Sequence, residues 1–293
     1  MKEIEEIQRN DLKKYLSKNI IIRIDYMPLS DALVDDLVAD ISKDLFDNNQ
    51  FSDVFEGVIS SVDIQLNNPE ISNNQSFFNV NNYTKIKSVE ILRFIDKNVY
   101  IKMIINKHFS CIDINCGMKY ISFEDYIEIF NKIIERLYEK DVRIKKIGFR
   151  KFNEFFVKNI ENEDILTYLN KDFFSYSYDF LKEKQTDIID DLISERKYTF
   201  AYDEKQINLI THLSKGLLEN KEVKRAAIDI DISINDLERL KNTFEQKRIV
   251  EKLNEINEII FKVFKKMLSK QFLNTLTKTE SIDEKFIGVN NNE

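Results

Sequence analysis

The stretch that most constrains the fold runs from Arg143 to Val157, RIKKIGFRKFNEFFV, in the middle of the 293-residue chain. Its isoleucines and phenylalanines lie between polar turns, which is the composition of a β-strand. Strict alternation fails, because Ile144 and Ile147 have opposite parity and would lie on opposite faces of a sheet. We therefore expect a strand that is buried on both faces, or one that contains a bulge near Gly148.

The chain before this stretch predicts a first α+β half over residues 1–160. The alternation of residues 19–28 is typical of a half-buried antiparallel strand, and the apolar stripe of residues 30–46 indicates a helix. Ser122, followed three residues later by Asp125, has the pattern of a helix capping box. The other segments predict strands at 54–66, 88–95, 99–105 and 109–116, and a loop at 67–84. This order of elements resembles an elaborated ferredoxin-like unit.

The second half, residues 161–278, is predicted to have a similar make-up. Alternating isoleucines and acids make residues 223–234 its clearest strand, and a stripe with steps of three and four predicts one long helix over 246–276. Weaker patterns predict a short helix at 163–173 and strands at 176–181, 197–202 and 206–213. Residues 279–293 are polar enough to be a disordered tail. The fold class is therefore α+β, with two associated antiparallel-sheet halves, helices packed on one face, and a long C-terminal helix.

Within the central stretch, Ile147 to Asn153 resembles the R-I-G-L-R-Y-I-N motif of a family of uncharacterised bacterial proteins with a sporadic distribution. The positions that agree with the motif are Gly148, Arg150 and Asn153. Lys146 and Lys151 stand where the family has an arginine and an aromatic residue. The resemblance singles out these positions as a binding or structural motif.

A second segment, Ala227 to Asp231, resembles the L-D-I-D strand of the same family. The family has no assigned activity, so the resemblance implies no reaction and no cofactor. Its scattered distribution implies accessory cargo of a bacterial genome, such as a phage-defence or toxin–antitoxin system. This implication is an analogy and does not come from the chemistry of the residues.

Composition limits where such a chain works and what it binds. The formal net charge is -7, which opposes non-specific attraction to nucleic acid or to anionic membranes. No window approaches the roughly 18 apolar residues of a membrane span, and the charged N-terminal segment lacks the apolar core of a signal peptide. We expect a cytoplasmic protein without a membrane segment. Cys111 and Cys116 lack the further ligands of a zinc site, so we expect buried free thiols and no metal.

The charged residues suggest two kinds of site, each with a plainer alternative. Asp229 and Asp231 share one face of a strand and could hold a divalent ion. A third acid and a lysine at the spacing of a nuclease site are missing. The alternative is that these acids are exposed or pair with basic residues. The central stretch also carries five basic residues interleaved with phenylalanines, a mixture that could bind RNA or DNA. These residues are Arg143, Lys145, Lys146, Arg150 and Lys151.

We therefore predict a non-enzymatic interaction or regulatory protein whose partner is encoded by a neighbouring gene. The alternative function is a nucleic-acid-binding component of a bacterial accessory system such as phage defence or toxin–antitoxin. A metal-dependent nuclease is the third possibility. The sequence does not decide whether the protein forms homo-oligomers. No phosphate-binding loop, zinc-protease motif or nucleophile-elbow motif occurs in the sequence. We further predict that Arg150 bonds to Asp229 or Asp231, with a cost on the order of 3 kcal/mol for its loss, whereas loss of Lys151 costs little.

Overall fold

The computed structural model describes most of the chain. The description covers residues 3–46, 53–66, 78–97, 99–117, 121–158, 165–174, 194–218, 221–245, 247–280 and 283–291. Side chains of residues 58–85 are outside it, and so is the strand predicted at 176–181.

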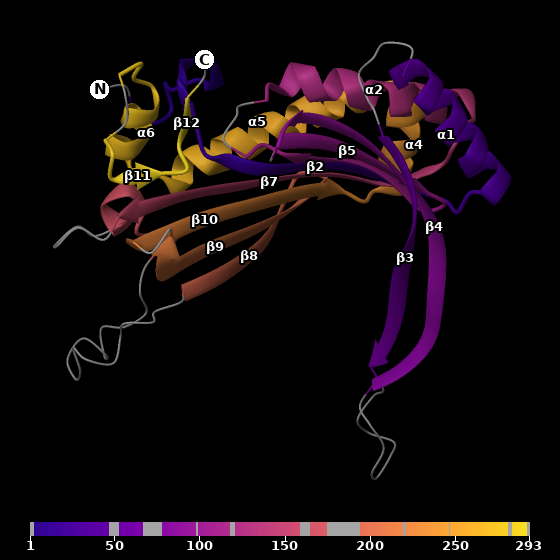
Figure 1. Cartoon of the computed structure of the whole chain (residues 1–293), viewed down its shortest axis with the longest axis horizontal. Helices are drawn as coiled ribbons and strands as arrows, with labels where there is room; N and C mark the ends of the chain where they lie inside the picture. The colour runs from indigo at the N-terminus through magenta and orange to yellow at the C-terminus, as the bar shows by residue number, and fades with distance from the viewer. Residues whose placement is uncertain are drawn as a thin grey trace, which may run out of the picture.

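The described chain forms one large antiparallel sheet with helices on one side (Figure 1). The strand order is β3-β4-β5-β6-β2-β7-β10-β9-β8, and β11 also pairs with β7. The strands are β2 (Ser17–Tyr26), β3 (Asp53–Leu66), β4 (Phe78–Asp96), β5 (Val99–Asn106), β6 (Phe109–Asn115), β7 (Ile144–Lys158), β8 (Ser194–Tyr202), β9 (Lys205–Leu218), β10 (Lys221–Ile234) and β11 (Phe286–Ile287). A separate ribbon pairs β1 (Lys14–Tyr15) with β12 (Asn290–Asn291).

The fold is α+β, and the two predicted halves are joined edge to edge. The first half contributes β2 to β7 and the second contributes β8 to β10, and the halves meet where β7 pairs with β10. The helices are α1 (Asp31–Phe46), α2 (Phe123–Glu139), α4 (Leu237–Glu245), α5 (Ile249–Met267) and α6 (Lys270–Leu276), with short 3-10 turns η1 (Arg9–Asp11) and η2 (Ile165–Tyr168). None of the described helices combines the length and the apolar character needed to cross a bilayer.

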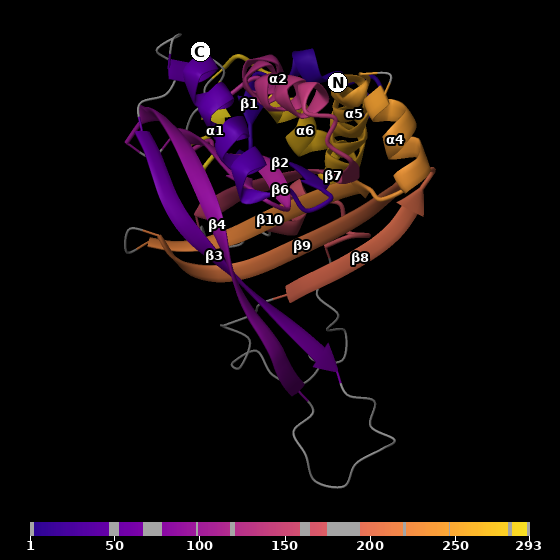
Figure 2. The same ribbon diagram turned by 90° about the vertical axis from the view of Figure 1, so that its right-hand side faces the viewer.

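One face of the sheet packs under the helices, and the other, here called the open face, carries no described helix (Figures 1 and 2). Burial alternates accordingly along the central strands. In β7 the odd-numbered residues from Ile147 to Val157 are buried and the even-numbered ones are partly or fully exposed. In β10 the alternation is weaker, because Ile230 and Ile232 are fully buried and Ala227, Asp229 and Ser233 on the other face are also buried. β3 and β4 extend beyond the sheet on the side away from the helices (Figure 2).

The central strand differs from its prediction in two ways. Among the described elements it is covered on one face only, and neither of its two register shifts against β2 falls at Gly148. The pairing of β7 with β2 runs without a break from Lys151 to Lys146 and then shifts, because Asp25 pairs with Lys146 while Tyr26 pairs with Ile144. The extra residue at this end of the strand accounts for the mixed parity of the isoleucines.

Other boundaries also differ from the sequence prediction. The long helix predicted over 246–276 is broken after Met267, where Leu268 is extended and the Ser269 hydroxyl accepts a bond from the Phe272 amide to start α6. β4 begins at Phe78, inside the predicted loop, and the helix predicted at 163–173 is reduced to η2. The capping box at Ser122 is confirmed: its hydroxyl accepts from the Asp125 amide at 3.2 Å.

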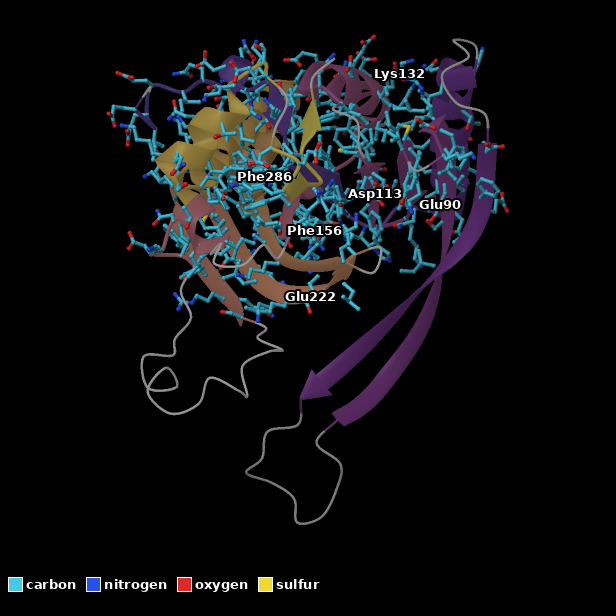
Figure 3. All side chains as sticks on the ribbon, turned by 60° about the vertical axis from the view of Figure 1, so that its left-hand side comes forward. Glu90, Asp113, Lys132, Phe156, Glu222 and Phe286 are labelled. Carbon is cyan, nitrogen blue, oxygen red and sulfur yellow. The ribbon has the colours of Figure 1, made fainter. Side chains whose placement is uncertain are left out.

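The tail from residue 279, predicted to be disordered, contains an ordered part in β11. Phe286 pairs with Val157 of β7 and is buried. Phe286 is labelled in Figure 3. Its ring stacks on Phe272 of α6 at 5.1 Å between centroids, and it meets Tyr168 of η2 at 4.8 Å. These rings supply the apolar contacts that outweigh the entropy of ordering a polar tail.

Candidate binding site

The predicted bond of Arg150 is made to Asp229, on the open face. Arg150 Nε lies 2.8 Å from Asp229 Oδ1, and Arg150 Nη2 lies 2.5 Å from Asp229 Oδ2. The guanidinium therefore donates two parallel hydrogen bonds to the carboxylate. The partner directly opposite Arg150 is Asp231, and the bond to Asp229 is therefore diagonal across β7 and β10. The hydrogen bonds that Arg150 donates to Asp229 raise the pKa of Arg150. Arg150 is 47% exposed, so its side chain is partly removed from water, while Asp229 is 11% exposed.

A second diagonal pair lies next to the first. Arg225 of β10 bonds to Glu154 of β7, and its guanidinium lies 5.9 Å from the centre of the Phe152 ring. Phe152 is thus placed between two ion pairs that both cross from β7 to β10. These pairs tie the two halves of the chain together at their common strand boundary.

The open face is hollowed beside Arg150. Arg23 of β2 and Ser233 of β10 are the two neighbours of Gly148 across the sheet. No atom of the described residues lies within 4 Å of the place where a side chain at Gly148 would begin, so the glycine leaves the floor of the hollow empty. The hollow measures about 370 Å³, and the residues around Gly148 that line it are Ile21, Arg23, Asp25, Lys146, Arg150 and Asp231.

The charges in this hollow are only partly paired. Arg23 bonds to Asp25 at 2.6 Å, with its guanidinium 3.8 Å from the centre of the Phe109 ring. Lys146 and Asp231 make no side-chain hydrogen bond or ion pair within the described residues. The hollow therefore offers one ammonium group and one carboxylate to a ligand that carries both kinds of charge.

The five basic residues predicted to contact nucleic acid do not share a surface. Lys151 is buried on the helix-covered face at 8% exposure, so its assignment as a nucleic-acid contact is wrong. Arg143, just before β7, and Lys145, at its start, are exposed. Lys146 lines the hollow, and Arg150 is bonded to Asp229. The alternation of a strand, which sends neighbours to opposite faces, separates them.

Asn153 and the two aspartates have structural contacts. The Asn153 side chain is buried, accepting from the Ser17 hydroxyl at 3.0 Å and donating to the Ile228 carbonyl at 3.4 Å, which links β2, β7 and β10. Asp229 is already occupied by Arg150. Within the described part of the chain no cluster of three or more histidines, cysteines or acids could hold a metal ion.

The residues that β2 contributes to the hollow were not among the site residues predicted from the sequence. Alternation in residues 20–26 does place Ile21, Arg23 and Asp25 on one face. The sequence gives no signal that this strand pairs with β7 and not with another strand. The three residues therefore could not be assigned to the motif before the strand order was known.

No protein-family model matches this sequence, and no curated protein matches it either.

Proposed function

We propose that this chain is a non-enzymatic binding protein that holds a protein partner on the open face of its sheet, at the Gly148 hollow. One observation carries the proposal: the position that the motif fills with glycine is the floor of a hollow about 370 Å³ in volume, next to a half-exposed arginine. A glycine inside a strand weakens the strand by itself, so close approach of a ligand is a common reason for one.

The charges of the open face favour a protein over a nucleic acid. Its cations are largely matched by carboxylates of the same face, as in the pairs Arg23–Asp25, Lys102–Asp113, Arg150–Asp229, Arg225–Glu154 and Lys197–Glu195. A polyanion would have to displace these acids before it could bind, and the net charge of -7 would repel it. A protein surface presents both donors and acceptors and is compatible with such a face.

The biological system in which the protein works is proposed from the resemblance of its central motif to the bacterial family. Gly148, Arg150 and Asn153 fit a family whose scattered distribution suits accessory systems such as phage defence or toxin–antitoxin pairs. In such systems the partner is commonly encoded by an adjacent gene. We therefore propose the product of a neighbouring gene as the protein that occupies the hollow.

A site-directed crosslink tests the proposal. Phe152 on the open face and Glu128 on α2 are each replaced by a photoreactive phenylalanine, and the chain is expressed from its own locus with its flanking genes. We expect Phe152 to crosslink to a flanking gene product and Glu128 not to do so. A nucleic-acid adduct at Phe152 would favour the alternative function, and crosslinks from Glu128 alone would contradict the open face as the site.

A matched pair of substitutions places the contact at the hollow. Gly148 and Gly216 lie in β7 and β9, and among the described residues neither has an atom within 4 Å of an added Cβ, so the first atom of a side chain meets no clash at either position. Gly148→Phe fills the hollow and should abolish the crosslink from Phe152, whereas Gly216→Phe should leave it intact. Equal loss with both variants would show a general effect on the sheet and would contradict the assignment.

A further inference from the structure

On the helix-covered side of β7, a small cavity lies below α5 and the N-terminal segment. It measures about 50 Å³, and a single water needs about 10–15 Å³ on the same measure. It therefore accommodates a group of a few heavy atoms. Much of its wall is apolar, with Leu16, Ile20, Phe123, Ile260 and Phe264 among the lining residues.

The side chain of Lys151 lines this cavity and has no bonding partner among the described residues. The residue is only 8% exposed, and its ammonium faces the rings of Phe149 at 5.3 Å and Tyr126 at 5.9 Å. Within the described residues its Nζ has no hydrogen-bond acceptor and no carboxylate in ion-pair range. A buried cation without a partner is expensive, and unpaired buried charges are found mainly where a ligand or a function requires them.

The charged residues that line the cavity are all cationic, and the other polar lining residues, Tyr15, Ser17 and Asn153, are neutral. Arg9, Lys14 and Lys151 line it, and none of its lining residues is an aspartate or glutamate. Arg9 is 22% exposed, which places it toward solvent, and its Nε has no partner among the described residues. Arg9 also lies 3.4 Å from Glu258, and the Lys14 Nζ donates to the Lys278 carbonyl.

We propose that this cavity binds a small organic monoanion, a carboxylate with a short apolar body, which accepts hydrogen bonds from Lys151 and Arg9. The carboxylate satisfies the two orphaned donors, and the apolar body packs against the phenylalanines and isoleucines. The volume excludes nucleotides and sugars. Lys151 lies on the opposite face of β7 from the Gly148 hollow, so the two sites are separate and the proposal does not depend on the partner protein.

The protonation of Lys151 agrees with this geometry. Burial, and next the nearby Arg9, lower the pKa of Lys151 to about 7, while Cys116, Glu258 and Glu124 act in the opposite direction. A bound carboxylate would add a further negative charge and would raise the pKa of the lysine.

Binding of simple carboxylates to the full chain tests the site. Sodium acetate, butyrate and benzoate are compared with sodium chloride at equal ionic strength by calorimetry and thermal melting. We expect at least one carboxylate to bind the natural chain and Lys145→Met alike, and to bind Lys151→Met about tenfold more weakly. Lys145 is the control because it lies in the same strand and is exposed. No binding of any of the three carboxylates, or equal binding to Lys151→Met, would overturn the proposal.

A measurement on the natural side chains makes the test independent of mutant folding. Lysines are reductively methylated with ¹³C, and the resonance that titrates near neutral pH is assigned to Lys151. With saturating carboxylate, its titration midpoint should move upward by about one unit or more, while the resonances of exposed lysines stay unchanged. An unchanged midpoint would overturn the proposal.

Discussion

Arg150 and Lys151 are consecutive residues of β7 that lie on opposite faces of the sheet: Arg150 is bonded to a carboxylate, and Lys151 has no acceptor in the part of the chain that the structure describes. The two-residue period of a strand imposes this separation. The two cations consequently have opposite effects on folding. Arg150 stabilises a nearly buried acid, whereas Lys151 gives up its hydration without gaining an ionic partner among the described residues.

Removing Arg150 should destabilise the protein measurably. Arg150→Ala leaves Asp229, which is 11% exposed, without its two hydrogen bonds. Because Arg150 is 47% exposed and water can reach the vacated site, we expect a cost of about 1–2 kcal/mol, below that of a fully buried pair. Urea unfolding gives the free energy. Lys145→Ala, in the same strand and exposed, is the control and should cost under about 0.5 kcal/mol.

A double-mutant cycle shows whether the pair itself is responsible. Asp229→Asn should cost about as much as Arg150→Ala, and the double variant should cost clearly less than the sum of the two. Strict additivity would mean that the two residues act independently, which would contradict the bidentate bond as the source of the stabilisation.

Replacing Lys151 should stabilise the protein, contrary to the sequence expectation of little effect. Met has nearly the length of lysine and suits the apolar wall, so we expect Lys151→Met to gain on the order of 2 kcal/mol at pH 7 without added carboxylate. Urea unfolding of both chains at several pH values measures the gain. A loss of stability with Lys151→Met would contradict the unpaired state of the ammonium.

The pH dependence of this gain has a definite sign. The pKa of Lys151 is about 7 in the folded chain and 10.5 in its ordinary state, so between these values the unfolded chain binds more protons. The stability of the natural chain therefore rises across this range as pH rises. The advantage of Lys151→Met should be largest below pH 7 and should shrink toward pH 10.5. A gain that is constant with pH would contradict the lowered pKa.

Local patterns were enough to predict several elements and one contact. The alternation of Ile20 to Tyr26 and the apolar stripe of α1 each depend on a period that a single segment reveals. The Arg150–Asp229 bond was predictable because an arginine within an apolar strand needs an acid, and the second half offered acids on a comparable strand. The contact follows from charge pairing, without knowledge of the full topology.

What could not be predicted depends on strand order and on which face is covered. Lys151 looks like an exposed cation in the sequence, and only the placement of α5 over the odd-numbered face of β7 makes it buried. The hollow requires β2 and β10 to flank Gly148, a relation between distant segments. The helix predicted over 246–276 ends at Met267, where the sequence has no proline or glycine that would predict a break. Tertiary packing decides each of these features.

Loss of the Phe286 ring tests whether the C-terminal segment contributes to stability. Phe286 is buried against Phe272 and Tyr168, so Phe286→Ala should cost about 3 kcal/mol by urea unfolding. Phe200→Ala is the control, because Phe200 is 43% exposed on the edge strand β8 and should cost much less. Equal, small effects of the two changes would support the disordered tail that the sequence suggests.

The final prediction concerns Glu204, which ties the β8–β9 turn to the helices. Its carboxylate lies 3.1 Å from the Lys252 Nζ of α5 and bonds to Arg239 of α4. Burial alone would raise the pKa of Glu204, but the hydrogen bonds from Arg239 and Lys252 outweigh it and lower the pKa to about 2. The stabilisation is therefore complete above the ordinary value of 4.5 and is lost as pH falls toward 2. Glu204→Gln should cost on the order of 1–2 kcal/mol at pH 7, and the difference from the natural chain in urea unfolding should vanish at the acid end. A difference that persists at pH values near 2 would show that packing, and not the charge of Glu204, holds the turn against α4 and α5.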